Sequence, residues 1–152
     1  MSWTNKSKYA ILNSYFRATG TPTNFYIALA TSAVAPTVDT NTFGQLTEIA
    51  TGNGYTTGGY QLTRNATDFD AINEDDTGNS GSIQIKDVTW TASGGSIPDT
   101  GNGARYALLT DDNGTVGSRE VYAFWDLGAD RQVSDTQVLT LQNLELRLQE
   151  PA

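Results

Sequence analysis

Hydrophobic and polar residues alternate along four stretches in the second half of the chain, which is typical of strands with one buried face. The stretches cover residues 82–92, 104–110, 120–127 and 137–148. Turns rich in Gly, Asn and Asp separate them, and short strands divided in this way are typical of antiparallel sandwiches and barrels. The pattern therefore predicts a mainly β protein, an antiparallel β-sandwich or barrel.

The alternation changes phase inside two of these stretches. In residues 82–92 the apolar side chains move from odd to even positions at Lys86-Asp87, and in residues 137–148 they do so at Gln142-Asn143. A one-residue bulge shifts every following side chain to the other face of a strand. A bulge at each of these two points would therefore keep the apolar residues on the inner face.

Turn residues also predict a hairpin in this half. Asp111-Asp-Asn-Gly114 has the composition of a type I′ turn. It would join the strand at residues 105–110 to the strand at residues 120–127.

The first half begins with the best helix candidate, at residues 4–19. Thr4 or Ser2 can cap its start, and Gly20 and Pro22 can end it. An apolar face comprises Tyr9, Leu12 and Phe16, widened by Ile11 and Tyr15. Because a helix this short needs docking to persist in water, we expect this face to be covered.

Residues 24–31 and 60–64 predict two further strands, with a glycine-rich loop around Tyr55 at residues 52–59. Residues 65–81 are the most polar stretch and include Asp68, Asp70, Glu74, Asp75 and Asp76. We expect a long exposed loop there, or an arm that becomes ordered only against a partner.

Composition narrows the range of functions. The 152 residues fit a single domain, and a net charge of −8 disfavours nucleic acid and anionic membrane surfaces as partners. The chain has no apolar run near the roughly 20 residues that span a bilayer, and its N-terminus lacks the apolar core of a signal peptide.

The chain contains no His and no Cys, so the commonest proton shuttle, thiol nucleophile and zinc ligands are absent. No Gly-x-Ser-x-Gly elbow is present, and the paired carboxylates lie in the polar stretch, where little would raise their pKa. We therefore expect a protein that is not an enzyme and has no cofactor or metal. An irregular calcium site from Asp70, Glu74 and Asp76 stays open, although the EF-hand spacing fails.

The aromatic residues of the β-rich half permit two uses, a binding platform or core packing. They are Trp90, Tyr106, Tyr122, Phe124 and Trp125. Because Tyr122 and Phe124 face one side of their strand and Trp125 the other, core packing is the use expected for most of them. Trp125 and Tyr55 are candidates for contact with a neighbouring subunit.

Four motifs follow one another along the chain. They are the start MSWTNKSK with its helix and the strand FYIALAT; LTEI followed by GNGYTTGGYQL; VTWTASGGSI; and ARYALL followed by VYAFWDLG. In this order they resemble a family of small β-rich structural proteins from the virions of tailed bacteriophages. The resemblance covers nearly all of the chain except residues 65–81, and its members include decoration, neck and tail-associated proteins.

The resemblance implies a non-enzymatic virion component, assembled in the host cytoplasm. A capsid decoration (cement) protein on the outer shell is the role expected, as a homo-oligomer, with a trimer favoured, bound to the major capsid protein or other virion proteins. A neck, tail or fibre-attachment component is the alternative, and a carbohydrate-binding β-sandwich a second one. The candidate partner contacts are Trp3, Tyr9, Phe43, Tyr55, Asp70, Glu74, Asp76 and Trp125.

Overall fold

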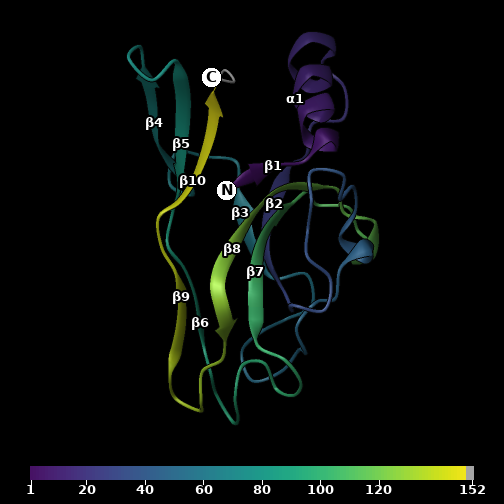
Figure 1. The fold of residues 1–152 in the computed structure, drawn as a ribbon, viewed down its shortest axis with the longest axis vertical. Coiled ribbons are helices and arrows are strands. Elements are labelled where there is room, and N and C mark those ends of the chain that lie inside the picture. Colours follow the sequence, from purple (N-terminus) through teal and green to yellow (C-terminus); the bar gives the residue numbers. More distant parts are fainter. Residues whose placement is uncertain (150–152) are drawn as a thin grey trace.

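The computed structural model describes residues 1–149, so the last three residues of the predicted domain lie outside the described part. It is mainly β, all of its strand pairs are antiparallel, and the sheets do not close into a barrel. Its elements are β1 (Ser2–Trp3), α1 (Asn5–Arg17), β2 (Asn24–Ala30), η1 (Phe43–Gln45), β3 (Tyr60–Thr63), β4 (Phe69–Asp75), β5 (Ser80–Ile85), β6 (Val88–Thr91), β7 (Ala104–Thr110), η2 (Val116–Ser118), β8 (Val121–Arg131), β9 (Val138–Leu141) and β10 (Leu144–Gln149). The predicted fold class, β-sandwich-like with a short N-terminal helix, is confirmed (Figure 1).

A five-stranded sheet with the order β1-β8-β7-β2-β3 forms the centre of the body. One of its faces packs against the ribbon β6-β9, in a core that joins Ile27 and Leu29 of β2 to Trp90 and Leu139 of the ribbon. Its other face carries a smaller cluster, in which Phe43 from η1 covers the small side chains of β2. Because both faces of the sheet are covered, the residues of β2 and β7 that point to one face and those that point to the other face are both mainly apolar.

The pairing of β5 with β10 and of β6 with β9 explains the two changes of phase. Ile85 pairs with Leu144 and Val88 pairs with Leu141, so the register runs unchanged across the interruption. Lys86-Asp87 and Gln142-Asn143 lie opposite each other outside the ladders, and Asn143 has a left-handed φ of 57°. The predicted positions are confirmed, but two matched interruptions replace the two independent bulges. Beyond this point β5 and β10 leave the body (Figure 1).

The hairpin of β7 and β8 is confirmed, but its turn is not the one predicted. Thr110 pairs with Val121, and the connection between them spans residues 111–120 and includes η2. The Asp111 carboxylate accepts hydrogen bonds from the backbone N–H of Asn113 (3.3 Å) and of Glu120 (3.0 Å). Gly114 does not have the positive φ that a type I′ turn needs, so the side chain of Asp111 holds the loop instead.

Helix α1 begins where the sequence predicts and ends slightly earlier. The Thr4 hydroxyl caps it by accepting from the Ser7 N–H at 3.1 Å, and Ala18 ends it in the left-handed conformation before Gly20 is reached. Ser7 and Ala10 are its buried residues. The expectation that Tyr9, Leu12 and Phe16 form the docked face is wrong, because these side chains are between 58 % and 74 % exposed.

The acidic segment is a hairpin arm and not a loop. Strands β4 and β5 pair with each other, and β10 completes a three-stranded sheet with the order β10-β5-β4. The Asp75 side chain holds the turn by accepting from the N–H groups of Thr77 and Gly78 at 3.1 and 2.9 Å. Few apolar residues occur in β4, and for this reason the alternation that marks the other strands is missing from it.

The base of the arm is fixed by a charged pair. Asp68 precedes β4 and lies 2.6 Å from the Lys86 ammonium, while its second oxygen accepts from the Thr63 N–H of β3 at 2.7 Å. The hydrogen bond from Lys86 lowers the pKa of Asp68 below its usual value. A second link is the Trp3 indole N–H, which donates to the Arg147 carbonyl of β10 at 2.7 Å.

Tyr55 lies inside the body although it belongs to a glycine-rich loop. Gly52 and Tyr55 exchange two backbone hydrogen bonds of 2.9 and 3.0 Å, which direct the phenol inward, where it is 1 % exposed. Its hydroxyl donates to the Glu48 carboxylate at 2.8 Å and accepts from the Leu29 N–H at 3.0 Å. The phenol thus joins the loop to β2.

Replacing Tyr55 by Phe should lower the free energy of unfolding by about 1–3 kcal/mol, because the buried N–H of Leu29 loses its acceptor. Urea unfolding measures this. Tyr9→Phe, at an exposed position, is the matched control and should stay within about 0.5 kcal/mol of wild type. A Tyr55→Phe variant as stable as wild type would contradict the role of the hydroxyl.

Asp68→Asn should lower the free energy of unfolding by about 1–3 kcal/mol at neutral pH, through loss of the charged hydrogen bond to Lys86. Since the folded state lowers the pKa of Asp68, the wild-type advantage is present above the unfolded pKa near 3.8 and disappears as the pH falls through the folded pKa. Unfolding curves from pH 7 to pH 2 test this, with the exposed Asp76→Asn as control. If wild type remained more stable than Asp68→Asn by the same free energy at pH 2, the role assigned to the charged pair would be contradicted.

Candidate functional site

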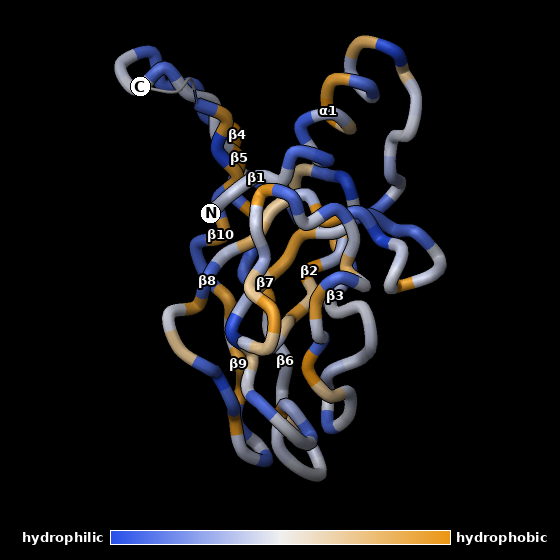
Figure 2. The backbone as a smooth tube through the Cα atoms, turned by 45° about the vertical axis from the view of Figure 1, so that its right-hand side comes forward, coloured by the Kyte–Doolittle hydropathy of each residue, from blue (hydrophilic) through white to orange (hydrophobic). Residues whose placement is uncertain are grey.

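Two projections extend from the same end of the body. The three-stranded arm (β4, β5 and β10) forms one, and α1 forms the other, with the N-terminus between them (Figure 1). Hydrophobic residues occur along α1 as well as along the central strands (Figure 2). These projections and the space between them form the candidate site.

The arm has one apolar face, and its own chain covers only part of it. Directly opposed residues of neighbouring strands share a face, which gives three successive rows. From base to tip the rows are Phe69, Ile85 and Leu144; Ile72, Ile83 and Leu146; and Glu74, Gly81 and Leu148. Leu146 is 7 % exposed, whereas Leu148 is 54 % exposed and Ile72 at the free edge is 75 % exposed. The outer part of the arm's apolar face is therefore exposed to solvent and is not covered by residues 1–149 of the chain itself.

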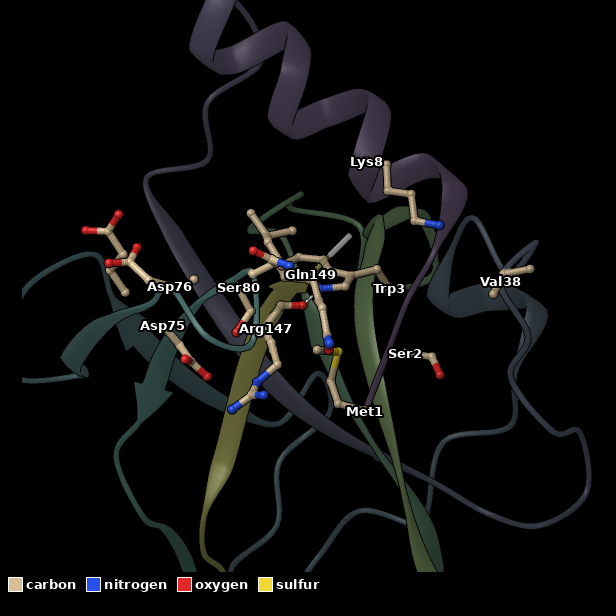
Figure 3. Close-up of a pocket in the computed structure, with 14 residues that line it drawn as sticks. Met1, Ser2, Trp3, Lys8, Val38, Asp75, Asp76, Ser80, Arg147 and Gln149 are labelled. Atoms are coloured by element: carbon tan, nitrogen blue, oxygen red, sulfur yellow. Dashed lines mark hydrogen bonds between the residues drawn. The ribbon is translucent and has the colours of Figure 1, made fainter. Parts of the chain in front are cut away.

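An apolar groove of about 460 Å³ separates the base of the arm from α1. Ile11 lines it on the helix side, Phe69 and Ile72 on the arm side, and Trp3 and Phe25 at its floor. Trp3 also lines a larger hollow of about 1090 Å³ near the tip of the arm. In that hollow Lys8 stands on the helix side, opposite Asp75 and Asp76 (Figure 3).

The outer face of α1, defined by Tyr9, Leu12 and Phe16, is the second uncovered apolar surface. At 100° per residue these positions lie opposite Ser7 and Ala10, which contact the body. Tyr15 extends the surface, with its ring edge-on to Phe16 at 5.0 Å between centroids. A cluster of large exposed apolar side chains marks an interaction surface more often than a free one.

The two surfaces carry opposite charge. Helix α1 contains Lys6, Lys8 and Arg17 and no acidic residue. Strand β4 and the turn after it contain no Lys or Arg, and their acidic residues are Asp70, Glu74, Asp75 and Asp76. A chain of net charge −8 thus presents one basic helix beside one acidic arm.

The structure divides the predicted contact residues into two groups. Tyr9, Asp70, Glu74 and Asp76 are exposed on the two projections, and Trp3 is half-buried between them. Phe43 and Tyr55 are buried in the body, so the prediction that they contact a partner is wrong. Trp125 is half-buried against the core and faces a small hollow next to Met1 and Glu145.

Sequence reasoning did not single out Ile72 and Leu148, which the structure leaves exposed. Ile72 is the one large aliphatic side chain in the acidic β4, and Leu148 continues the even-numbered apolar series beyond Leu146. Both signals were present in the sequence. Their exposure depends on the arm leaving the body, which the sequence pattern does not indicate.

Residues 1–149 contain no group of three or more acidic, His or Cys side chains that could hold a metal ion, so the calcium alternative at Asp70, Glu74 and Asp76 finds no support. Trp90 and Tyr122 are buried in the core and cannot form a carbohydrate platform. In the same part of the chain no helix has the length and apolar character needed to cross a membrane.

The arrangement offers two exposed apolar surfaces and the groove beside them for docking. Most side chains that line the groove are apolar, and the polar ones are Arg64, Asn65 and Asp70. Neither the models of known protein families nor the curated proteins include a match to this chain.

Proposed function

We propose that this chain is a non-enzymatic structural protein of a bacteriophage virion, and that it decorates the outer shell of the capsid as a cement protein. The observation that carries the proposal is the pair of uncovered apolar surfaces, on α1 and on the arm, at one end of a β-sandwich-like body. The resemblance of the sequence motifs to virion proteins of tailed phages supports the same role.

A cement protein works by burying surface between its neighbours. A stable interface of standard size buries about 1,600 Å² in total, and repetition over a symmetric shell adds avidity to modest single contacts. Two projections allow one molecule to contact more than one neighbour. The net charge of −8 would suit basic rims on the shell, with the major capsid protein or another virion protein as the partner.

The number of copies in a purified virion tests the proposal. Quantitative mass spectrometry against the major capsid protein should find hundreds of copies, at about one per capsid subunit or one trimer per local three-fold axis. A dozen copies or fewer would place the chain in the neck or tail instead. Absence from the particle would contradict any structural role in the virion.

Rebinding to particles assembled without this protein tests the docking surface itself. Leu148→Glu places a charge on the uncovered end of the arm and should weaken binding about tenfold or more. Val138→Glu is the matched control, because Val138 is similarly exposed but lies on β9 of the body. Equal binding by both variants would show that the arm contributes nothing to binding, either by touching the shell or by touching a neighbouring copy.

A further inference from the structure

We infer that copies of this chain associate head to tail, with the outer face of α1 in one copy packed against the distal arm of the next. The distal arm is the surface formed by Ile72 and Leu148 together with Asp70, Glu74, Asp75 and Asp76. This goes beyond the proposed function, since it specifies how copies meet. If the chain proves to be monomeric, this inference fails and the proposed role in the virion is unaffected.

The outer face of α1 requires a partner from outside its own chain. Ser7 and Ala10 hold the helix on the body, with Thr4 anchored to β8 through its hydroxyl and the Val121 carbonyl. This fixes the rotation of the helix about its axis. Ile11 consequently faces the groove of its own subunit, while Tyr9, Leu12 and Phe16 do not line it. These three side chains cannot reach the arm of the same molecule without undocking the helix.

Charge decides which surface of a second copy fits. Two α1 helices packed together would bring six basic side chains together with no acidic residue from either helix, and the Lys6 of each copy is already paired with Glu120 of its own chain at 3.0 Å. Two distal arms packed together would bring eight carboxylates together, against one basic residue per copy, Arg147 of β10, which already pairs with Glu145 of its own strand at 3.1 Å. Only the contact of α1 with the arm joins opposite charges around apolar centres, and like-charge contacts are strongly disfavoured at interfaces.

The shapes are consistent with this choice. An exposed helix face is convex, whereas the arm forms one wall of a hollow (Figure 3). Trp3 lines both this hollow and the groove. Leu148 supplies apolar area in that hollow and Ile72 in the groove. Tyr9, Leu12 and Phe16 supply the matching area on the helix. Burial of both sets removes five large exposed apolar side chains from water.

The symmetry follows from the contact. Two different surfaces meet, so an open assembly keeps one free helix at one end and one free arm at the other end until a ring closes. The trimer favoured from the sequence would be one such ring. An association of this kind permits complementation, because a copy with a damaged helix still has an intact arm.

Two single variants and their mixture test the inference. Phe16→Glu damages the helix surface and Ile72→Glu the arm surface, and both side chains are exposed in the single chain, so the fold is preserved. Sedimentation equilibrium and native mass spectrometry should show a closed oligomer for wild type. Each variant alone should associate at least about tenfold more weakly. Val138→Glu should behave as wild type.

An equimolar mixture of the two variants is the decisive sample. The intact helix of Ile72→Glu can pack on the intact arm of Phe16→Glu, so the mixture should form a heterodimer that grows no further. Formation of that heterodimer also shows that each variant is folded at its undamaged surface. A mixture that remains monomeric, or an Ile72→Glu variant that assembles like wild type, would overturn the inference.

A wild-type chain that stays monomeric at every concentration would also overturn it. The basic, apolar helix would then be tested with vesicles containing anionic lipid. Binding to these vesicles that Phe16→Glu abolishes would assign the outer face of α1 to a membrane surface instead of a second copy.

Discussion

The structure depends on one two-stranded ribbon whose apolar face stays inward while both strands change phase. Strands β5 and β6 run antiparallel to β9 and β10, and the pairing of Ile85 with Leu144 and of Val88 with Leu141 holds the register across the change. Below this point the ribbon closes the core of the sandwich. Above it the same ribbon, joined by β4, forms the arm. One continuous piece of sheet therefore links the hydrophobic core to the docking surface.

This link explains why the arm can be ordered although much of it is exposed. Isolated hairpins are marginal in water, but a third strand and attachment to a packed core both stabilise them. Strand β10 supplies the third strand, and Asp68 and Lys86 join the arm to the body beside β3. Helix α1 is fixed in a comparable way, by its Thr4 cap and its contact with β8. Both projections are thus held in a defined direction while their apolar residues remain available.

Much of the fold could be predicted from the sequence because its local signals agree with the tertiary structure. The Thr4 cap, the strand of residues 24–30 and the phase changes at Lys86-Asp87 and Gln142-Asn143 each follow from a periodicity or a local preference. The candidate site was harder to predict. Periodicity shows that Tyr9, Leu12 and Phe16 share a face, but it does not show which face meets the body.

Two further errors have the same physical origin. The loop around Tyr55 is rich in glycine and reads as exposed, yet a pair of backbone hydrogen bonds turns the phenol towards β2. Strand β4 reads as a loop because its residues are polar, yet pairing with β5 makes it a strand. In both cases a long-range partner decides the outcome, and a local pattern does not identify that partner.

The central claim is that a second copy of the chain covers the exposed apolar surfaces of α1 and the arm when the protein assembles. Amide hydrogen exchange, measured on the wild-type chain at low and at high protein concentration, tests it most directly. The account predicts that protection rises with concentration in α1 and β4 together, while the strands of the body exchange at the same rate in both samples. Protection that is independent of concentration, or that rises only in the loops of the body, would contradict it.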